Sequence, residues 1–148
     1  MAIRTAHTAW TGGLTDGSGE VELQSSGIAN FTVSFPRRIA DEAEGVTSPE
    51  ELIAAAHSAC YAMQFSHLLS EAGATPENVD VTASVELAPD PDGGFFIPGI
   101  SLTVRGYAEG IDENTFWKLA NEAKATCPVS KALSAVKSIE LAVTFEDF

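Results

Sequence analysis

Two cysteines are the only thiols in this 148-residue chain, and their different settings suit redox chemistry. Cys60 lies in a long run of apolar and small residues, and Cys127 directly precedes Pro128. We expect the first thiol to be desolvated and the second to lie at the start of a helix, where backbone N–H groups favour a thiolate. Such a pair can cycle between two thiols and a disulfide, provided that the Cα atoms lie about 4.4–6.8 Å apart.

Each cysteine also has a purely structural interpretation. Most free cysteines are small buried hydrophobic residues, and burial alone raises the pKa of a thiol and makes it inert. Cys60 therefore needs a nearby cation in order to react. His57 lies one helical turn before Cys60, and it is either a base for that thiol or a packed, hydrogen-bonded core residue. The chain has no Cys-x-x-Cys motif, and its three histidines lack the paired spacing of zinc ligands.

Charged residues upstream of Cys60 are candidate partners for its thiolate. An arginine stays charged in a dry pocket, so Arg37 or Arg38 suits this task, although both are equally explained as solvated loop charges. Glu50 suits the first turn of a helix, ten residues before Cys60. Because that spacing is about 15 Å along a helix, Glu50 must act through an arginine or come from a second chain. The second option predicts a site shared across a dimer interface.

Composition narrows the class of protein. The net charge is −13 and the sequence pI is about 4.4, so nucleic acid and membrane surfaces are not expected as partners. The N-terminal residues lack the apolar segment of a signal peptide, and no apolar run is long enough to span a membrane. We therefore expect one cytoplasmic domain over residues 1–148. In a reducing compartment a cysteine pair is more often catalytic than structural.

Hydrophobic periodicity predicts an α+β fold. A helix is expected from Ser48 to about residue 72, with Ser48 as its N-cap, Glu51 completing a capping box and Gly73 ending it. This helix is apolar or small nearly all round, so we expect it to be buried. Strands are predicted over residues 4–10, 20–24, 31–35, 79–87, 95–107 and 138–145, with helices over 112–124 and 129–135. Pro98 and Gly99 indicate a bulge or an edge inside the strand 95–107.

Two long motifs resemble the signatures of the OsmC/Ohr family. The first is Ser48-Pro49-Glu50-Glu51-Leu52-Ile53-Ala54-Ala55-Ala56-His57-Ser58-Ala59-Cys60, and the second is Cys127-Pro128-Val129-Ser130-Lys131-Ala132-Leu133. The second motif is more similar to the OsmC branch than to the Ohr branch. Phe35-Pro36-Arg37-Arg38 resembles the Phe-x-x-Arg of the family, although the doubled arginine leaves Arg37 and Arg38 as alternatives.

The resemblance implies a fold of antiparallel sheets packed around a long buried helix, in an intertwined homodimer with two active sites at its interface. It also implies a thiol peroxidase that acts on organic hydroperoxides without metal, haem or flavin. Cys60 is then the thiol that attacks the peroxide, Cys127 the thiol that forms a disulfide with it, Arg38 the activating cation and Glu50 the acid that orients Arg38. A dithiol then restores the thiols, and the resemblance suggests one carried by a lipoylated protein. Candidates for an apolar wall around Cys60 are Tyr61, Met63 and Phe65.

Two other hypotheses remain open at this stage. The chain is alternatively a non-catalytic redox sensor or binding module, in which the same disulfide changes a surface that a partner recognises. It is otherwise a structural protein whose cysteines are inert core residues. Turnover with a supplied dithiol distinguishes an enzyme from a sensor, and the reactivity of the thiols distinguishes both from a structural protein.

Overall fold

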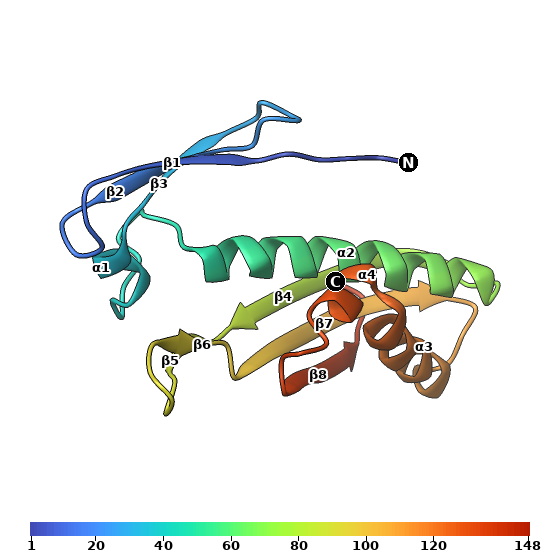
Figure 1. Cartoon of the computed structure of the whole chain (residues 1–148). Helices are drawn as coiled ribbons and strands as arrows, with labels where there is room; N and C mark the ends of the chain where they lie inside the picture. The colour runs from blue at the N-terminus through green and yellow to red at the C-terminus, as the bar shows by residue number, and fades with distance from the viewer. The chain divides into compact units, whose positions relative to one another are not determined.

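The computed structural model describes residues 1–148 and combines helices with three small sheets, which confirms the expected α+β class (Figure 1). The chain divides into two compact units, Met1–Leu52 (unit 1) and Ile53–Phe148 (unit 2). The two units are described separately below. No helix in the chain combines the length and the apolar character needed to cross a membrane.

Unit 1 is built on a three-stranded antiparallel sheet. Its strands are β1 (His7–Thr11), β2 (Ser18–Glu22) and β3 (Asn30–Val33), in the order β1-β2-β3. Only β2 has fully buried positions, at Gly19 and Val21, which alternate with exposed neighbours.

A short helix, α1 (Phe35–Arg38), follows β3 where the sequence predicted that a strand would continue through Phe35. The strand ends early because Ser34 caps the helix, its hydroxyl accepting a hydrogen bond from the Arg37 N–H at 3.4 Å. Pro36 also fits the first helical turn, because the N–H that it lacks is not needed there. The two arginines are thereby fixed in a helical turn rather than in a loop.

The long helix α2 (Pro49–Glu71) begins where the sequence predicted. The Ser48 hydroxyl accepts a hydrogen bond from the Glu51 N–H at 3.2 Å, which confirms Ser48 as the cap. In a capping box the Glu51 carboxylate would accept from the Ser48 N–H. It instead accepts a hydrogen bond from the Thr47 hydroxyl at 2.6 Å, so only the Ser48 half of the expected capping box is present. Gly73 follows the helix with a φ of 82°, a conformation that favours glycine.

Helix α2 buries one stripe rather than its whole circumference. The fully buried side chains recur at every fourth position, namely His57, Tyr61, Phe65 and Leu69. The opposite side carries Ala55, Ala59 and Met63, and Met63 is 73% exposed. In the single chain only one side of α2 is buried, whereas its composition predicted that nearly all of its surface would be buried.

Unit 2 contains a three-stranded sheet in the order β4-β7-β8, formed by β4 (Thr75–Val85), β7 (Gly99–Glu109) and β8 (Ser138–Phe145). Strand β4 is antiparallel to β7, with Val81 opposite Val104. Strand β8 is parallel to β7, with Leu141 opposite Leu102, so this sheet is mixed and not purely antiparallel as expected. The parallel pairing is possible because two helices connect β7 to β8.

The strand predicted over residues 95–107 is broken at Pro98. The structure instead forms β6 (Phe95–Phe96), which pairs with β5 (Ala88–Pro89), and a separate β7 from Gly99 onward. A proline lacks the N–H that a central strand such as β7 would need, which explains the break.

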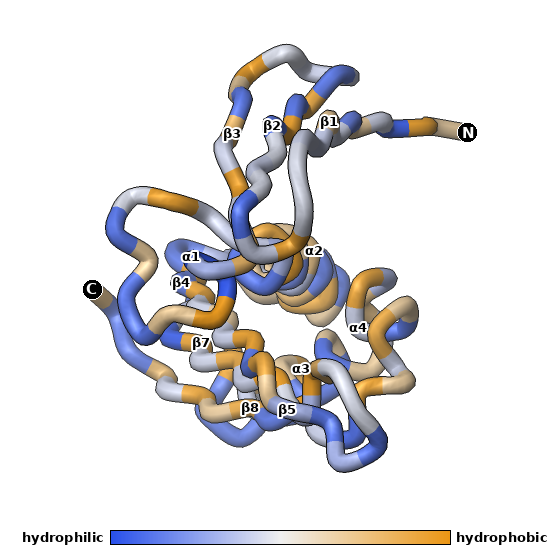
Figure 2. The backbone as a smooth tube through the Cα atoms, turned by 60° about the vertical axis from the view of Figure 1, so that its left-hand side comes forward, coloured by the Kyte–Doolittle hydropathy of each residue, from blue (hydrophilic) through white to orange (hydrophobic).

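The core of unit 2 lies between the sheet and two helices that cover the same face. Helix α3 (Glu113–Thr126) and α2 meet through Phe116 and Phe65, whose ring centroids are 4.8 Å apart, and Phe116 reaches Phe145 of β8 at 4.9 Å. Hydrophobic and hydrophilic residues alternate along β7 and β8, as Figure 2 shows. Helix α4 (Pro128–Ala132) follows α3 after the single residue Cys127. The packing of α3 on α2 thus places the α3–α4 junction beside α2.

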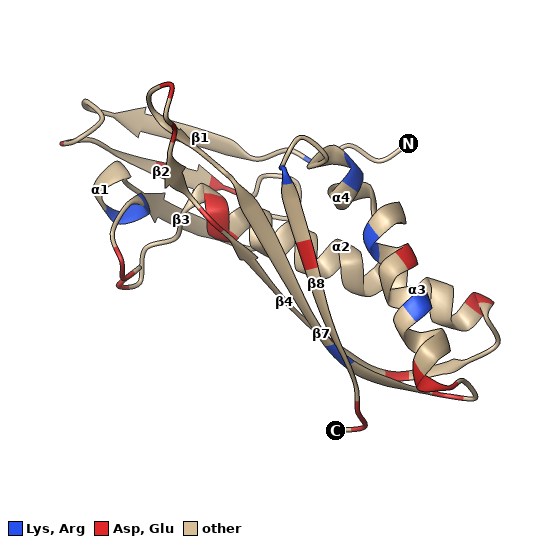
Figure 3. Cartoon of the chain, turned by 90° about the horizontal axis from the view of Figure 1, so that it is seen from below, with Lys and Arg blue, Asp and Glu red and all other residues tan.

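Charged residues stay outside this core. Figure 3 shows both basic and acidic residues on α3 and basic residues on α4. The lysines of these two helices, Lys118, Lys124 and Lys131, are exposed or half-buried. The buried cluster of unit 2 contains no Lys, Arg, Asp or Glu.

Candidate active site

The two cysteines meet inside unit 2. Their Sγ atoms lie 3.1 Å apart and share a hydrogen bond, although 67 residues separate them in the sequence. Both are free thiols, with Cys60 on α2 partly buried and Cys127 fully buried. The sequence could state the proximity of the two thiols only as a condition for redox chemistry, and the structure shows them in contact. The sulfur atoms need to approach by about 1 Å to form a disulfide.

Cys127 is held at this place by the two helices that it joins. Its N–H donates to the Ala123 carbonyl at 2.8 Å, which completes α3, and its carbonyl accepts from the Lys131 N–H at 3.0 Å, which begins α4. Pro128 occupies the first turn of α4, as its missing N–H and fixed φ favour. Because one residue both ends a helix and starts the next, its side chain has little freedom to move.

The surroundings of Cys127 favour its thiolate. Burial raises the pKa of the Cys127 thiol, but hydrogen bonds from the Ser130 N–H, the Cys60 thiol, the Ser130 hydroxyl and the Val129 N–H outweigh it. The net result is a Cys127 pKa below the usual value for a thiol. The sequence predicted that the start of a helix would favour a thiolate at Cys127, and the structure identifies the hydrogen-bond donors that do so.

Cys60 has the opposite balance. Burial raises the pKa of the Cys60 thiol, and its hydrogen bond to Cys127, together with the negative charge there, raises it further. The Val129 N–H offsets only part of this effect. No positive charge in unit 2 contributes to the pKa of Cys60. The cation that Cys60 needs in order to react is therefore not supplied by this unit.

His57 is a buried core residue with one hydrogen bond. Its Nε2 atom lies 2.7 Å from the Ser130 hydroxyl oxygen. Of the two alternatives that the sequence left open for His57, the structure supports the packed and hydrogen-bonded residue. Ser130 was not singled out from the sequence, although it belongs to the second motif and lies three residues after Cys127, where a short helix brings it back toward that thiol.

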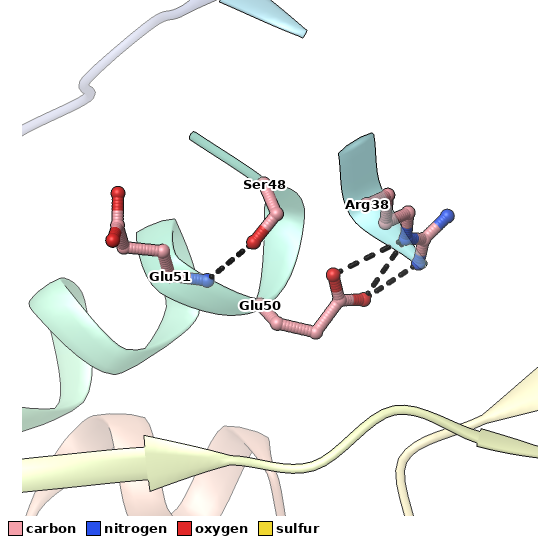
Figure 4. A network of polar contacts seen from close by, with 4 residues as sticks. All are labelled: Arg38, Ser48, Glu50 and Glu51. Carbon is pink, nitrogen blue, oxygen red and sulfur yellow. Dashed lines mark hydrogen bonds and ion pairs between the residues drawn. The ribbon is translucent and has the colours of Figure 1, made fainter. Parts of the chain in front are cut away.

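Arg38 and Glu50 form a two-pronged ion pair within unit 1 (Figure 4). The Arg38 Nε donates to both carboxylate oxygens of Glu50 at 3.1 and 3.2 Å, and Nη2 donates to Oε1 at 2.7 Å. The Glu50 side chain is only 8% exposed, so its carboxylate depends on this partner. The expected arginine–glutamate pair is therefore present as a contact.

Arg37 has a different environment. Its guanidinium contacts the Glu44 carboxylate at 2.7 Å, and these two side chains are 38% and 63% exposed. An exposed ion pair of this kind contributes little. The geometry of unit 1 thus favours Arg38 over Arg37 as the arginine that Glu50 orients.

The three candidates for an apolar wall around Cys60 lie in two different environments, and Cys60 packs against the buried cluster that contains two of them. Tyr61 and Phe65 are fully buried in the core of unit 2, where the Tyr61 hydroxyl donates to the Ala120 carbonyl at 2.7 Å. Met63 lies on the exposed side of α2. Tyr61 and Phe65 share the buried stripe because residues four apart lie on one face of a helix, whereas Met63, two positions from each, is rotated to the other side. No group of three or more His, Cys, Asp or Glu side chains is arranged to hold a metal.

Comparisons with known proteins agree with this geometry. The sequence pattern of the OsmC-like protein family matches residues 41–142. Peroxiredoxin OsmC of Escherichia coli (strain K12) is 43% identical over 126 residues, which cover 85% of this chain and 86% of that protein. Organic hydroperoxide resistance protein OhrA of Bacillus subtilis is 30% identical over 122 residues, covering 82% and 84%. The crystal structure of an organic hydroperoxide resistance protein OsmC from Legionella pneumophila superposes with a TM-score of 0.75 at 28% identity, covering 97% of this chain and 99% of that chain.

Removing the Arg38 guanidinium should destabilise the fold, because the Glu50 carboxylate is then buried without a partner. We expect Arg38→Met to lower the free energy of unfolding by about 1–3 kcal/mol in urea denaturation. Arg37→Met is the matched control, and its exposed pair with Glu44 should change the stability by less than about 0.5 kcal/mol. Equal losses in the two variants would contradict the distinction drawn between the arginines.

Proposed function

Since the chain belongs to the OsmC/Ohr family, we propose that it is a cysteine-based peroxidase that reduces organic hydroperoxides to alcohols. The observation that carries the proposal is the 3.1 Å approach of the Cys60 and Cys127 sulfur atoms. The names of the relatives support it, because they include a peroxiredoxin and organic hydroperoxide resistance proteins. Two free thiols in contact with each other can take up the two electron equivalents of a peroxide reduction by forming a disulfide.

The difference in burial supports an order for the two cysteines. A peroxide must reach the sulfur that it oxidises, and Cys60 is partly exposed whereas Cys127 is fully buried. The Cys60 thiolate attacks the O–O bond, takes the terminal OH and becomes a sulfenic acid, while the alkoxide leaves and gains a proton to become the alcohol. Cys127 then displaces the hydroxyl group of the sulfenic acid as water, which forms the disulfide.

Arg38 is proposed as the cation that makes Cys60 reactive. Inside unit 2 the pKa of Cys60 is raised, so a group from elsewhere has to stabilise the thiolate. The Glu50 carboxylate fixes the orientation of the Arg38 guanidinium, which remains positively charged in a dry site. This role for Arg38 rests on the family motif and on its pairing with Glu50.

A second copy of the chain and a dithiol reductant complete the proposal. The exposed side of α2, with Ala55, Ala59 and Met63, is an apolar surface that a homodimer would cover. A dithiol, such as a lipoyl group on a protein, restores the enzyme by attacking the disulfide at the accessible Cys60 sulfur.

Replacement of each cysteine should stop the peroxidase reaction at a different step. We expect Cys60→Ser to abolish the reduction of an organic hydroperoxide such as cumene hydroperoxide with a supplied dithiol. Cys127→Ser should still consume one equivalent of peroxide and leave a sulfenic acid on Cys60, which dimedone labels. Full turnover by Cys60→Ser would contradict the proposal. A single slow oxidation of the unmodified protein, without repeated turnover, would identify a redox sensor instead.

Loss of the activating cation should slow the reaction with peroxide. We expect Arg38→Met to reduce kcat/KM for the hydroperoxide about 100-fold or more, because removal of one charged donor from a thiolate or oxyanion site has effects of this size. The assay is run well below the unfolding temperature of each variant, so that the loss of stability does not affect the measured kcat/KM. Arg37→Met should retain kcat/KM within a few-fold. A loss in Arg37→Met with activity retained in Arg38→Met would assign the role to Arg37.

A further inference from the structure

A buried chain of polar groups leads from α2 to the Cys127 sulfur, and the peroxidase chemistry described above does not use it. His57 has no exposed surface, Ser130 is 6% exposed, and the His57 Nε2 lies 2.7 Å from the Ser130 Oγ. The Ser130 hydroxyl in turn interacts with the Cys127 sulfur. Polar groups are placed in a core at a cost, so a connected series that ends on a reactive sulfur calls for an explanation.

The unpaired nitrogen of His57 sets the direction of this chain. Its Nδ1 atom is buried and no protein group lies within hydrogen-bonding distance of it. Burial lowers the pKa of His57, so the ring is neutral and carries a single N–H. An orphaned buried N–H is rarer in proteins than an unpaired acceptor, which favours the proton on Nε2. The Nε2–H group then donates to the Ser130 hydroxyl oxygen.

The direction of the first bond determines the second. A serine hydroxyl has one hydrogen to donate. Because the Ser130 oxygen accepts from His57, its own hydrogen is available for the Cys127 sulfur, with which it interacts. A donor that is itself polarised by another N–H stabilises an anion better than an isolated hydroxyl does.

No cation competes for this role at Cys127. Within four residues of Cys60 or Cys127 the titratable groups are the two thiols, His57, Tyr61, Lys124 and Lys131. The other titratable groups of α2 and α3 lie farther along these helices and are Glu50, Glu51, His67, Glu71, Glu113, Lys118 and Glu122. The Tyr61 hydroxyl donates to a carbonyl of α3, the Lys124 ammonium donates to the Ile139 carbonyl at 2.9 Å, and Lys131 is exposed. Burial and the charge on Cys127 raise the pKa of Tyr61, whose hydroxyl is already bonded to the Ala120 carbonyl. Apart from the Cys60 thiol, the side chain that donates a hydrogen bond to the Cys127 sulfur is that of Ser130.

We propose that Ser130 and His57 are positioning residues that hold Cys127 as a thiolate aimed at Cys60 for the step in which the disulfide forms. The inference rests on the proposed peroxidase function and extends it. In this step the Cys127 sulfur attacks the sulfur of the Cys60 sulfenic acid, the S–S bond forms and the S–O bond breaks. Cys127 is oxidised and the sulfenic sulfur is reduced. Hydroxide leaves with the S–O electron pair and takes up a proton, which balances the proton that Cys127 lost on ionising.

The first test needs no peroxide. In the Cys60→Ser background Cys127 is the only thiol, and its ionisation is followed by thiolate absorbance near 240 nm as the pH is raised. We expect Ser130→Ala to raise the titration midpoint of Cys127 by about one pH unit, the size expected for loss of a hydrogen bond to a charged group. Ser130→Thr should keep the midpoint because it keeps the hydroxyl. Ser134→Ala, at an exposed serine, is the control and should not change it.

A second pair of variants tests the role of His57. The amide nitrogen of glutamine reaches the place of Nε2, whereas that of asparagine reaches only the place of Nδ1. We therefore expect His57→Gln to keep the Cys127 midpoint and His57→Asn to raise it. If Ser130→Ala does not fold, this comparison still tests whether the hydrogen bond from His57 to Ser130 stabilises the Cys127 thiolate.

The third measurement follows the disulfide step in protein with both cysteines. With one equivalent of organic hydroperoxide, Ser130→Ala should still oxidise Cys60 but form the disulfide about tenfold more slowly, as measured by dimedone labelling of Cys60. An unchanged midpoint together with an unchanged disulfide rate would overturn the inference. A parent protein that consumes no peroxide would contradict the proposed function, while the titration would still decide the role of Ser130.

Discussion

The approach of two sulfur atoms to 3.1 Å is the contact on which the rest of this structure depends. It is produced by the packing of α3 on α2, where Phe116 contacts Phe65, and by the bend at Cys127 between α3 and α4. A helix turns by about 100° per residue, so a shift of either helix by one position would point a thiol away from its partner. The apolar core therefore does more than stabilise the fold, because it fixes the geometry that disulfide chemistry requires.

The surroundings of the two thiols divide the chemical work between them. Cys127 is buried and collects neutral donors from Ser130 and Val129, which stabilise its charge without bringing a cation into the core. Cys60 is partly exposed, and within unit 2 its pKa is raised. The Glu50 carboxylate fixes the orientation of the Arg38 guanidinium. This guanidinium is proposed to stabilise the Cys60 thiolate and has no proposed role at Cys127. In the proposed function, the Cys60 thiolate is stabilised by a positive charge and the Cys127 thiolate by hydrogen bonds, which suits two thiols that react in succession.

Local patterns in the sequence predicted most elements of the fold, and contacts between distant segments account for what they missed. The N-cap Ser48, the helix that follows it and the strand Ser138–Phe145 are encoded by neighbouring residues, and all three are present. The parallel pairing of β8 with β7 depends on the path of two intervening helices, which periodicity does not specify. The contact of Cys60 with Cys127 was an expectation conditional on distance. Ser130 was missed and the state of His57 was left open, because their hydrogen bond joins residues 73 positions apart and has no local signal.

The central claim is that an organic hydroperoxide oxidises Cys60 and that Cys127 of the same chain completes the reaction. Mass spectrometry of the reduced protein after one equivalent of such a peroxide tests it most directly. The account predicts the loss of two hydrogens per chain and, in a non-reducing digest, a peptide pair that links Cys60 to Cys127. Recovery of Cys127 as a free thiol, with Cys60 either unmodified or carrying added oxygen, would contradict it.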